Sequence, residues 1–315
     1  MDAGPVLTTA DYGCDVLGRL RRVMLHRPTD ALKLITAANC RRWLWDDVPD
    51  IGRFLDEHDR YRDLLESCGV EVIELADCVG HPGCVRRLPN LIYLHDIAVI
   101  SRRGALLSAM ASEARRGEAR VVREALTHLG VPMLIEMDEP ADRFEGCLLL
   151  SAETLLVADT ERHDARTIGK FVKRALEHFE EVIYVAVPKA RRFMHPDTIY
   201  NRIDYHLALA YPPALPHAVL CTREGAEPID LVEHMRRHDV EVIPVSDVEQ
   251  AALACSCVPL EPGVIIHYDT ALSRATRRRL ARRGVELILF HPEAMLAGGG
   301  SLRCLTLRIH RESTA

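Results

Sequence analysis

The chain has 315 residues, of which 48% are hydrophobic and 27% are charged, and its 40 basic and 46 acidic side chains give a net charge of −6. This composition supports a sizeable core and argues against disorder, and the lack of a basic excess argues against nucleic acid as a main partner. No apolar run of about 18 residues could span a membrane, the first fifteen residues contain no apolar signal segment, and ten scattered cysteines are typical of a reduced compartment, so we expect a cytoplasmic protein.

Short apolar runs alternate with amphipathic stretches along the whole chain. The runs are rich in Val and Ile and are bounded by turn formers or charges, which predicts strands. In chain order they are residues 21–27, 70–75, 97–101, 131–136, 148–151, 154–159, 181–187, 217–222, 240–245, 263–268 and 285–290. Helical periodicity predicts helices between them, over residues 51–69, 113–130, 165–180, 230–239 and 273–284.

A helix end followed by a Val-Glu-Val-type strand recurs along the sequence. The pattern appears at 68–75, 238–245 and 283–290, with a close variant at 129–136. Repetition at roughly 50–60 residues favours a repeated α/β unit, although ordinary α/β alternation would also produce it. No linker rich in Pro, Gly or Ser divides the chain, so we expect residues 1–315 to form a single domain.

The sharpest candidate for chemistry lies near the C-terminus, where glycines 298–300 precede Ser301 and Cys304. A glycine-rich turn lets the backbone approach a ligand closely. A thiol just after such a turn, at the expected start of a strand, is a candidate nucleophile. The alternative is a buried structural cysteine beside a flexible loop.

A second candidate pair is His195 and Asp197, which lie two residues apart. On an extended segment their side chains would face the same way, because the strand period is two. They would then offer a base and a cation-binding group to one pocket. The alternative is a turn aspartate beside Pro196 with a histidine on the surface.

Two carboxylates complete the candidate set. Asp96 lies within an apolar run, where burial without a cationic partner would cost several kcal/mol. Glu145 stands directly before an apolar run, a position that a solvated turn would also explain. The spacings are 49 from Asp96 to Glu145, 50 from Glu145 to His195 and 109 from His195 to Cys304. These are about one, one and two repeat lengths, so a closed ring of units would bring the four residues together.

This ordered set of motifs resembles the arginine deiminase and amidinotransferase group of guanidine-modifying enzymes. The resemblance rests on Arg-Arg-Val-Met-Leu-His-Arg-Pro at 21–28, Leu-Trp-Asp-Asp at 44–47 with the helix that follows, Leu-His-Asp at 94–96, Phe-Glu-Gly-Cys at 144–147, Met-His-Pro-Asp-Thr at 194–198 and the glycine-rich segment with its Arg-Glu end at 298–312. It implies the pentein fold, an α/β-propeller of five pseudo-symmetric ββαβ units around a central site.

The resemblance also implies roles for the residues at matching positions. Cys304 would attack the guanidinium carbon, and His195 would shuttle protons. Glu145 would orient His195 and contact the guanidinium group, while Asp96 and Asp197 would bind its nitrogens. The implied reaction is hydrolysis of arginine or an arginine-like compound to a ureido product and ammonia, through a covalent amidino-thioether on Cys304. An amidinotransferase is the alternative, and an inactive pentein used for binding is a third interpretation.

The departures from the group's pattern concern the amino-acid end of arginine. His95 stands where the group has Arg, Cys147 and Leu148 stand where it has Gly-Asp, and Gly299 stands where arginine deiminases have a loop Arg. We therefore expect a substrate other than plain arginine, or arginine held by other groups. The candidate residues for these contacts are His95, Arg115, Arg116, Gly299, Gly300 and Arg303.

Two further expectations concern what the chain lacks. The helical insert of long arginine deiminases is absent, since only about twenty residues (76–95) connect the two matching motifs. No Cys-x-x-Cys pair or His-x-x-Glu-His pattern occurs, and Cys255 and Cys257 follow an apolar stretch that predicts packing. We therefore expect no metal and no organic cofactor, a small guanidine as the partner, and neither nucleic acid nor membrane. The sequence leaves a homo-oligomer open.

Overall fold

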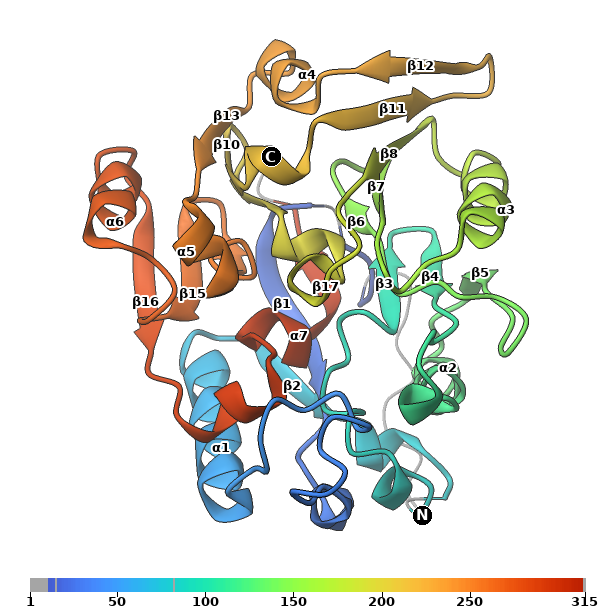
Figure 1. Cartoon of the computed structure of the whole chain (residues 1–315), viewed down its shortest axis with the longest axis vertical. Helices are drawn as coiled ribbons and strands as arrows, with labels where there is room; N and C mark the ends of the chain where they lie inside the picture. The colour runs from blue at the N-terminus through green and yellow to red at the C-terminus, as the bar shows by residue number, and fades with distance from the viewer. Residues whose placement is uncertain (1–10, 15, 82, 314–315) are drawn as a thin grey trace.

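The computed structural model describes residues 11–14, 16–81 and 83–313, and they form five small sheets. In each sheet a middle strand pairs antiparallel with one neighbour and parallel with the other. Figure 1 shows α1, α2, α3, α4 and α6 around the outside, with β17, β3 and β6 near the centre. This arrangement is the repeated ββαβ unit, so the prediction of a pentein α/β-propeller is confirmed.

The five units follow one another around the ring. The first comprises β17 (Leu307–Glu312), β1 (Arg19–Leu25), α1 (Ile51–Ser67) and β2 (Glu71–Glu74). The second comprises β3 (Ala98–Ser101), β4 (Gly104–Leu107), α2 (Glu118–His128) and β5 (Met133–Glu136). The third comprises β6 (Leu148–Leu149), β7 (Thr154–Asp159), α3 (Ala165–Ala175) and β8 (Glu181–Ala186). The fourth comprises β9 (Tyr200–Asp204), β10 (Leu207–Ala210), α4 (Leu231–Arg237) and β13 (Glu241–Pro244). The fifth comprises β14 (Val258–Glu261), β15 (Val264–Tyr268), α6 (Arg274–Ala281) and β16 (Glu286–Phe290).

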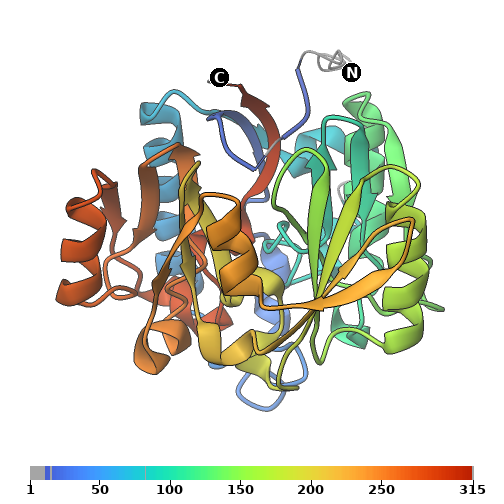
Figure 2. The same cartoon turned by 90° about the horizontal axis from the view of Figure 1, so that it is seen from above.

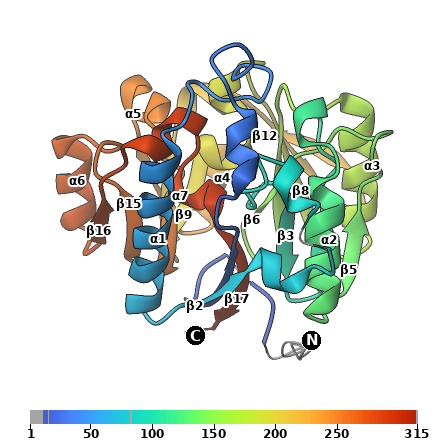
Figure 3. The same cartoon turned by 90° about the horizontal axis from the view of Figure 1, so that it is seen from below.

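The first unit is assembled from both ends of the chain. β17 pairs antiparallel with β1, with Met24 opposite Leu307 and Val23 opposite Arg308. Figure 3 shows α1 of this unit between α6 of the fifth unit and α2 of the second. The ring is thus closed by a strand pair whose members lie almost the full sequence apart, and this closure places the segment before β17 at the centre.

The fourth unit carries an insertion between β10 and α4. It is a hairpin of β11 (His217–Cys221) and β12 (Ala226–Ile229), and β11 pairs antiparallel with β8 of the third unit. Figure 2 shows this hairpin reaching from the fourth unit across to the third. A short helix, α5 (Asp247–Ala251), follows β13 and leads towards the fifth unit.

Local sequence chemistry explains the outer helices. In α1 the Asp50 side chain accepts a hydrogen bond from the backbone N–H of Arg53, which caps the first turn. Phe54, Tyr61 and Leu65 form the buried face. Gly69, with φ of 78°, ends the helix in the left-handed conformation that glycine adopts without strain. Burying each of these large apolar side chains contributes about 1.5–3 kcal/mol to folding.

The predicted helix over 113–130 is wrong in its first turn. Residues Glu113–Arg115 form a separate 3-10 turn, and α2 begins only at Glu118. Gly117 breaks the helix because its φ of 89° lies in the left-handed region, and its N–H donates to the Glu139 carboxylate. Within the described ranges no helix has both the length and the apolarity needed to cross a membrane.

Candidate active site

Four of the five units place a reactive side chain just before their first strand. Asp96 precedes β3, Glu145 precedes β6, His195 and Asp197 precede β9, and Cys304 precedes β17. The first strands contact one another around the centre, β17 with β3, β3 with β6 and β9 with β14. The segments leading into them therefore converge on one region. In the fifth unit the corresponding segment carries Cys255 and Cys257, which are fully buried.

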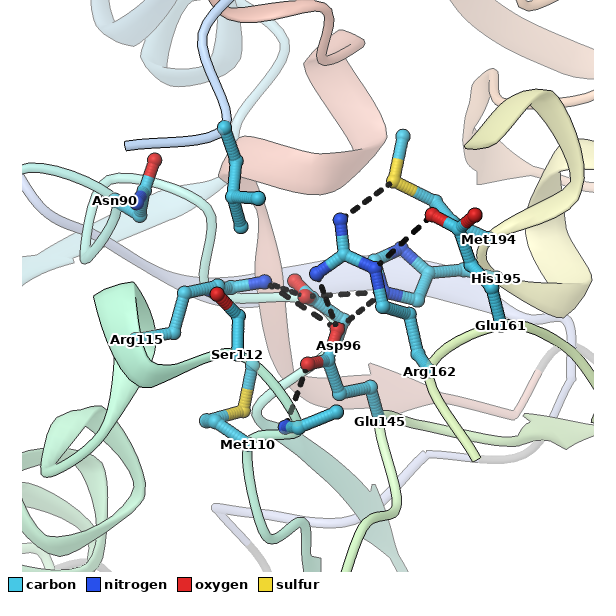
Figure 4. Close-up of polar contacts among 12 residues, drawn as sticks. Asn90, Asp96, Met110, Ser112, Arg115, Glu145, Glu161, Arg162, Met194 and His195 are labelled. Carbon is cyan, nitrogen blue, oxygen red and sulfur yellow. Dashed lines mark hydrogen bonds and ion pairs between the residues drawn. The ribbon is translucent and has the colours of Figure 1, made fainter. Parts of the chain in front are cut away.

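Three of these side chains meet in a buried cluster, shown in Figure 4. The His195 Nε2 lies 3.0 Å from Glu145 Oε2 and 3.4 Å from Asp96 Oδ2. The exposed fraction is 7% for His195, 4% for Asp96 and 0% for Glu145. The structure thus brings together residues that lie about 50 positions apart in sequence and come from three different units.

Glu145 is held as a carboxylate by its neighbours. Its Oε1 accepts a hydrogen bond of 2.8 Å from the Ala111 N–H, and its Oε2 lies 3.3 Å from Arg162 Nη1. Burial alone would raise the pKa of Glu145, but the hydrogen bond with His195 and the charges of Arg162 and Arg115 outweigh it and hold the pKa well below its ordinary value. A charged carboxylate beside the imidazole fixes the orientation of His195.

The same cluster of Asp96, Glu145 and His195 has metal-ligand spacing, with its ligand atoms within 4.8 Å of one another. Two guanidinium groups already face its carboxylate oxygens, since Arg115 Nη1 forms a close ion pair with Asp96 and Arg162 contacts Glu145. A metal ion here would be repelled by both cations at short range. The carboxylates of this cluster are therefore already paired with guanidinium groups in the described structure.

Cys304 lies in α7 (Leu302–Leu305), a single helical turn, rather than at the start of a strand as predicted. The turn forms because the Ser301 Oγ accepts a hydrogen bond from the Cys304 N–H at 3.3 Å. The same Oγ lies 3.3 Å from the Cys304 Sγ. Burial, and next the negative charge of Asp197, raise the pKa of the Cys304 thiol to about 12. The thiol is therefore neutral at physiological pH until another charge approaches.

Asp197 is 1% exposed and lies in the 3-10 turn Pro196–Thr198, not on the extended segment that the sequence predicted. Pro196 starts this turn, while His195 keeps an extended backbone. Among the described residues, Asp197 Oδ2 has no hydrogen-bond partner, and Arg303 Nε lies 3.8 Å away. A buried carboxylate oxygen without a donor is costly, and the contact of this atom with a ligand stays a prediction.

The remaining predicted positions fall into two groups. Gly299 and Gly300 line the central cavity, and a Cβ at Gly300 would overlap the ring of Tyr93. His95 and Arg303 are buried and bond each other, with 3.2 Å between Arg303 Nε and His95 Nε2. Arg303 also donates to Asn201 at 3.0 Å. Among the described residues, four of the predicted ones do not line the cavity, namely His95, Glu145, Asp197 and Arg303, so their contact with a substrate stays a prediction.

The central cavity measures about 40 Å³. It is lined by Leu44, Asn90, Tyr93, Asp96, Arg115, Arg162, Arg191, Met194, His195, Gly298, Gly299, Gly300 and Cys304. Of the arginines that the sequence suggested, Arg115 is present in this lining, whereas Arg116 is exposed. Arg162 and Arg191 were missed. Arg162 lies just beyond β7 and Arg191 lies shortly before His195, and neither position shows in the sequence that the side chain approaches the cavity.

Arg115 is held on three sides. Its Nε donates to Glu118 at 2.8 Å, its Nη2 donates to the Tyr93 carbonyl at 2.9 Å, and its Nη1 pairs with Asp96. Burial raises the pKa of Glu118 to about 8, even though Arg115 opposes this shift. The Tyr93 hydroxyl is buried and has no partner within the described part of the chain. It therefore joins Asp197 Oδ2 as a free polar atom at the site.

A second layer of contacts, also missed from sequence, connects Glu145 to the His195 segment. The Glu145 N–H donates to His163 Nε2 at 3.0 Å, and His163 Nδ1 lies 3.0 Å from Thr160 Oγ1. Thr160 Oγ1 in turn donates to the Met194 carbonyl at 2.7 Å. Burial lowers the pKa of His163 to about 4, so the imidazole is neutral and its Nε2 can accept. This chain of bonds fixes the backbone on both sides of the Glu145–His195 pair.

Comparison with solved structures gives the class of this fold. Dimethylarginine dimethylaminohydrolase from Pseudomonas aeruginosa, in complex with citrulline, matches with a TM-score of 0.67 and 17% identity over 92% of this chain and 99% of that chain. Unliganded AgrE matches with a TM-score of 0.71 and 18% identity over 93% of this chain and 40% of that chain. The fold is that of the guanidine-modifying penteins.

The family is shown by sequence. The arginine deiminase family model matches residues 79–311. The chain is 24% identical to the arginine deiminase of Mycoplasma capricolum over 94% of this chain and 96% of that protein. It is 22% identical to the arginine deiminase of Staphylococcus aureus over 99% of this chain and 100% of that protein. The chain therefore belongs to the arginine deiminase family, and it is a cysteine-dependent guanidine-modifying enzyme of the hydrolase type.

Proposed function

We propose that this protein hydrolyses the guanidinium group of arginine or an arginine-like compound, releasing ammonia and a ureido product. The observation that carries the proposal is the convergence of Cys304 with Asp96, Glu145, His195 and Asp197 from four structural units. A guanidinium ion is a planar, delocalised cation, and carboxylates on two sides bind it through charge-assisted hydrogen bonds. Such binding holds its central carbon in place for attack by a nearby sulfur.

The ion pairs within the site support the proposal that it binds a guanidinium group. Asp96 and Glu145 already contact guanidinium groups, those of Arg115 and Arg162, so their geometry suits this chemical group. The cavity of about 40 Å³ has room for only a few water molecules. A substrate therefore enters only if side chains that fill the cavity move. Arg115 and Arg162 are the groups whose places a bound guanidinium would share.

The thiol is activated by the substrate in this mechanism. With a pKa near 12, roughly one Cys304 thiol in 10⁵ is ionised at neutral pH. A guanidinium cation bound between the carboxylates offsets the negative charge of Asp197 and stabilises the thiolate. The thiol proton passes to His195, which Glu145 orients. Cys304 is thus inert towards other electrophiles until the correct cation is bound.

The reaction then proceeds in two balanced half-reactions. The Cys304 sulfur bonds to the guanidinium carbon, one C–N bond breaks, and ammonia leaves with the proton carried by His195. Water then adds to the carbon of the amidino-thioether, giving its proton to His195. Collapse breaks the C–S bond, and the ureido product and the free thiol are formed. The sum is one guanidinium ion plus water giving one ureido compound plus ammonium.

Three accompanying expectations belong to the same proposal. Residues 1–315 would form one catalytic domain, which the closure of the ring by β1 and β17 supports. The protein would work in the cytoplasm, which the ten free cysteines support. Its partner would be a small guanidine compound rather than nucleic acid or a membrane, which the net charge of −6 supports.

The test measures both products from a single substrate. Purified protein is incubated with arginine or a substituted guanidine, with no amine acceptor added, and ammonia and ureido product are quantified. Equal amounts of both, abolished in Cys304→Ala and retained in the half-buried control Cys84→Ser, support hydrolysis. Product formation only after addition of an amine acceptor would assign amidino transfer instead, and full activity of Cys304→Ala would refute the mechanism.

A further inference from the structure

A second, larger cavity adjoins the catalytic one. Its volume is about 500 Å³, and it shares Arg191, Met194 and Gly299 with the catalytic cavity. Its other lining residues are Asp46, Arg192, Gln250, Ala251, Ala252, Leu253, Thr270 and Leu296. We call this space the outer cavity. Arg191 therefore stands at the boundary, and a substrate whose guanidinium group is bound near Cys304 can extend past it.

The charge of Arg191 is the least neutralised in either cavity. Its Nη2 donates to the Leu44 carbonyl at 2.5 Å, and its nearest carboxylate oxygen, from Asp46, is 3.7 Å away. Asp46 is closer to another cation, since its Oδ1 lies 2.7 Å from Arg41 Nη1. One shared carboxylate at this distance leaves much of the positive charge of Arg191 unpaired.

The other arginines of the two cavities are satisfied. Arg115 and Arg162 face the carboxylates of the catalytic cluster. Arg192 lies 2.9 Å from Asp247, donates to Gln250 at 2.6 Å and stacks over the rings of Phe193 and Tyr211. Arg191 is therefore the cation best placed to bind an anionic group of a ligand.

Because Gly299 has no side chain, the guanidinium group of Arg191 can lie close to its backbone. Gly299 has a φ of 69°, and a Cβ at this position would lie 2.6 Å from Asp46 Oδ2 and 3.2 Å from Arg191 Nη2. The guanidinium group of Arg191 thus packs where a side chain of residue 299 would begin. A positive charge is supplied to this part of the cavity from the segment before His195 rather than from the glycine-rich loop.

We propose that Arg191 determines specificity by binding the carboxylate of a guanidino acid, and that the outer cavity accepts a substituent carried beyond it. This inference rests on the proposed hydrolysis and names its substrate class. The predicted substrates are arginine derivatives with a free carboxylate and an enlarged amino end, such as an Nα-acyl group. The decarboxylated analogue of arginine lacks the group that Arg191 binds.

The experiment compares three guanidines that differ only at this end. L-arginine, Nα-acetyl-L-arginine and agmatine are assayed with the wild type, Arg191→Gln, Asp46→Asn and the exposed control Arg42→Ala. Arg191→Gln should raise KM for both acids by roughly 10- to 100-fold, the loss of one charge-assisted contact, and leave kcat/KM for agmatine within about twofold. Asp46→Asn should shift KM for the acids in the opposite direction, because it frees more of the charge of Arg191.

The outcomes separate this inference from the proposed function. Turnover of both acids, with acetylarginine accepted at least as well as arginine and with the KM shifts above, supports it. A preference of the wild type for agmatine, or an equal loss for all three compounds in Arg191→Gln, would overturn it while hydrolysis stands. Failure of the wild type to release ammonia from any guanidine would overturn the proposed function itself. Should Arg191→Gln fail to fold, the Asp46→Asn shift decides.

Discussion

The inner and outer parts of the site are built in different ways. The inner part consists of one side chain or pair from each of four units, placed at the same point of the repeat, and all of them are buried except the half-buried Cys304. The outer part consists of the half-buried Arg191 and the exposed Asp46, which lie on connections between units and are loosely paired. The pseudo-symmetry of the fold thus fixes the groups proposed for chemistry, whereas the connections between units supply the groups proposed for substrate choice.

This difference explains why the two parts can change independently. Moving a residue of the inner cluster would disturb packed strands at the centre. A change at Arg191 or Gly299 alters only the mouth of the cavity. Substitutions in the inner part should therefore lower kcat for every guanidine, and substitutions in the outer part should act on KM for particular ones.

The strongest test of the inner part removes the nucleophile. Cys304→Ala should lower kcat by roughly four orders of magnitude or more, because no other group supplies the covalent step. Steady-state ammonia release checks this, with Cys84→Ser as the matched control. A residual rate within tenfold of the wild type would show that Cys304 is not the nucleophile and that the inner part does not carry the chemistry.

The next largest effect is expected at Glu145. Glu145→Gln keeps the shape but removes the charged acceptor that orients His195, so kcat should fall by about 10²- to 10⁴-fold with KM little changed. Glu136→Gln, a surface carboxylate paired with Arg123, serves as control and should stay at the wild-type rate. An effect on KM alone would assign Glu145 to binding rather than to orienting the imidazole.

The second layer behind the inner part makes stability depend on pH. His163 has a pKa of about 4 in the folded protein and an ordinary value near 6.5 when unfolded. Below pH 6.5 the unfolded chain therefore binds a proton that the folded protein does not, so stability falls as the pH is lowered towards 4. The loss should be about 3 kcal/mol larger in the wild type than in His163→Gln between pH 7 and pH 4.

Denaturant unfolding at several pH values measures this difference. His178→Gln, on a half-buried histidine with no such hydrogen bonds to the site, is the control and should follow the wild type. Identical pH dependence in the wild type and His163→Gln would mean that His163 does not stay neutral in the folded state.

The smallest expected effect concerns Ser301. Its hydroxyl contacts the Cys304 sulfur, so Ser301→Ala should raise the thiol pKa further and lower kcat about tenfold. The pH dependence of Cys304 alkylation by iodoacetamide should shift upwards, and Ser301→Thr should restore it. Ser273→Ala removes an equivalent helix cap from α6 and should change stability alone. If both alanine variants behave alike, Ser301 acts only as a cap.

The residues of the inner part could be predicted from the sequence, because polar residues interrupt apolar strand ends at the spacing of the repeat. Asp96, Glu145 and His195 could be placed together from that pattern, and the resemblance to a known family assigned their roles. The local backbone conformation was not predicted correctly from the sequence. Ser301 caps a helical turn that contains Cys304, and Pro196 starts a 3-10 turn that contains Asp197. Such capping bonds depend on backbone positions that hydrophobic periodicity does not encode.

The outer part had no comparable signal. Arg191 lies on a connection between units, and its approach to the cavity depends on how neighbouring units pack; the same holds for Arg162, which contacts Glu145 of the inner part. Some strands were also missed, for physical reasons. β9 is largely polar in sequence, and β12 contains Pro228 and is exposed at a sheet edge, so neither reads as an apolar run.

The central claim is that a guanidinium ion is held beside Cys304 and becomes bonded to its sulfur. Rapid acid quenching of the protein with substrate, followed by peptide mass analysis, tests it directly. The account predicts an amidino-type mass increase on the Cys304 peptide alone, which disappears as product forms and is absent without a guanidine. Turnover with an unmodified Cys304 peptide at every time point, or an adduct on another cysteine, would contradict it.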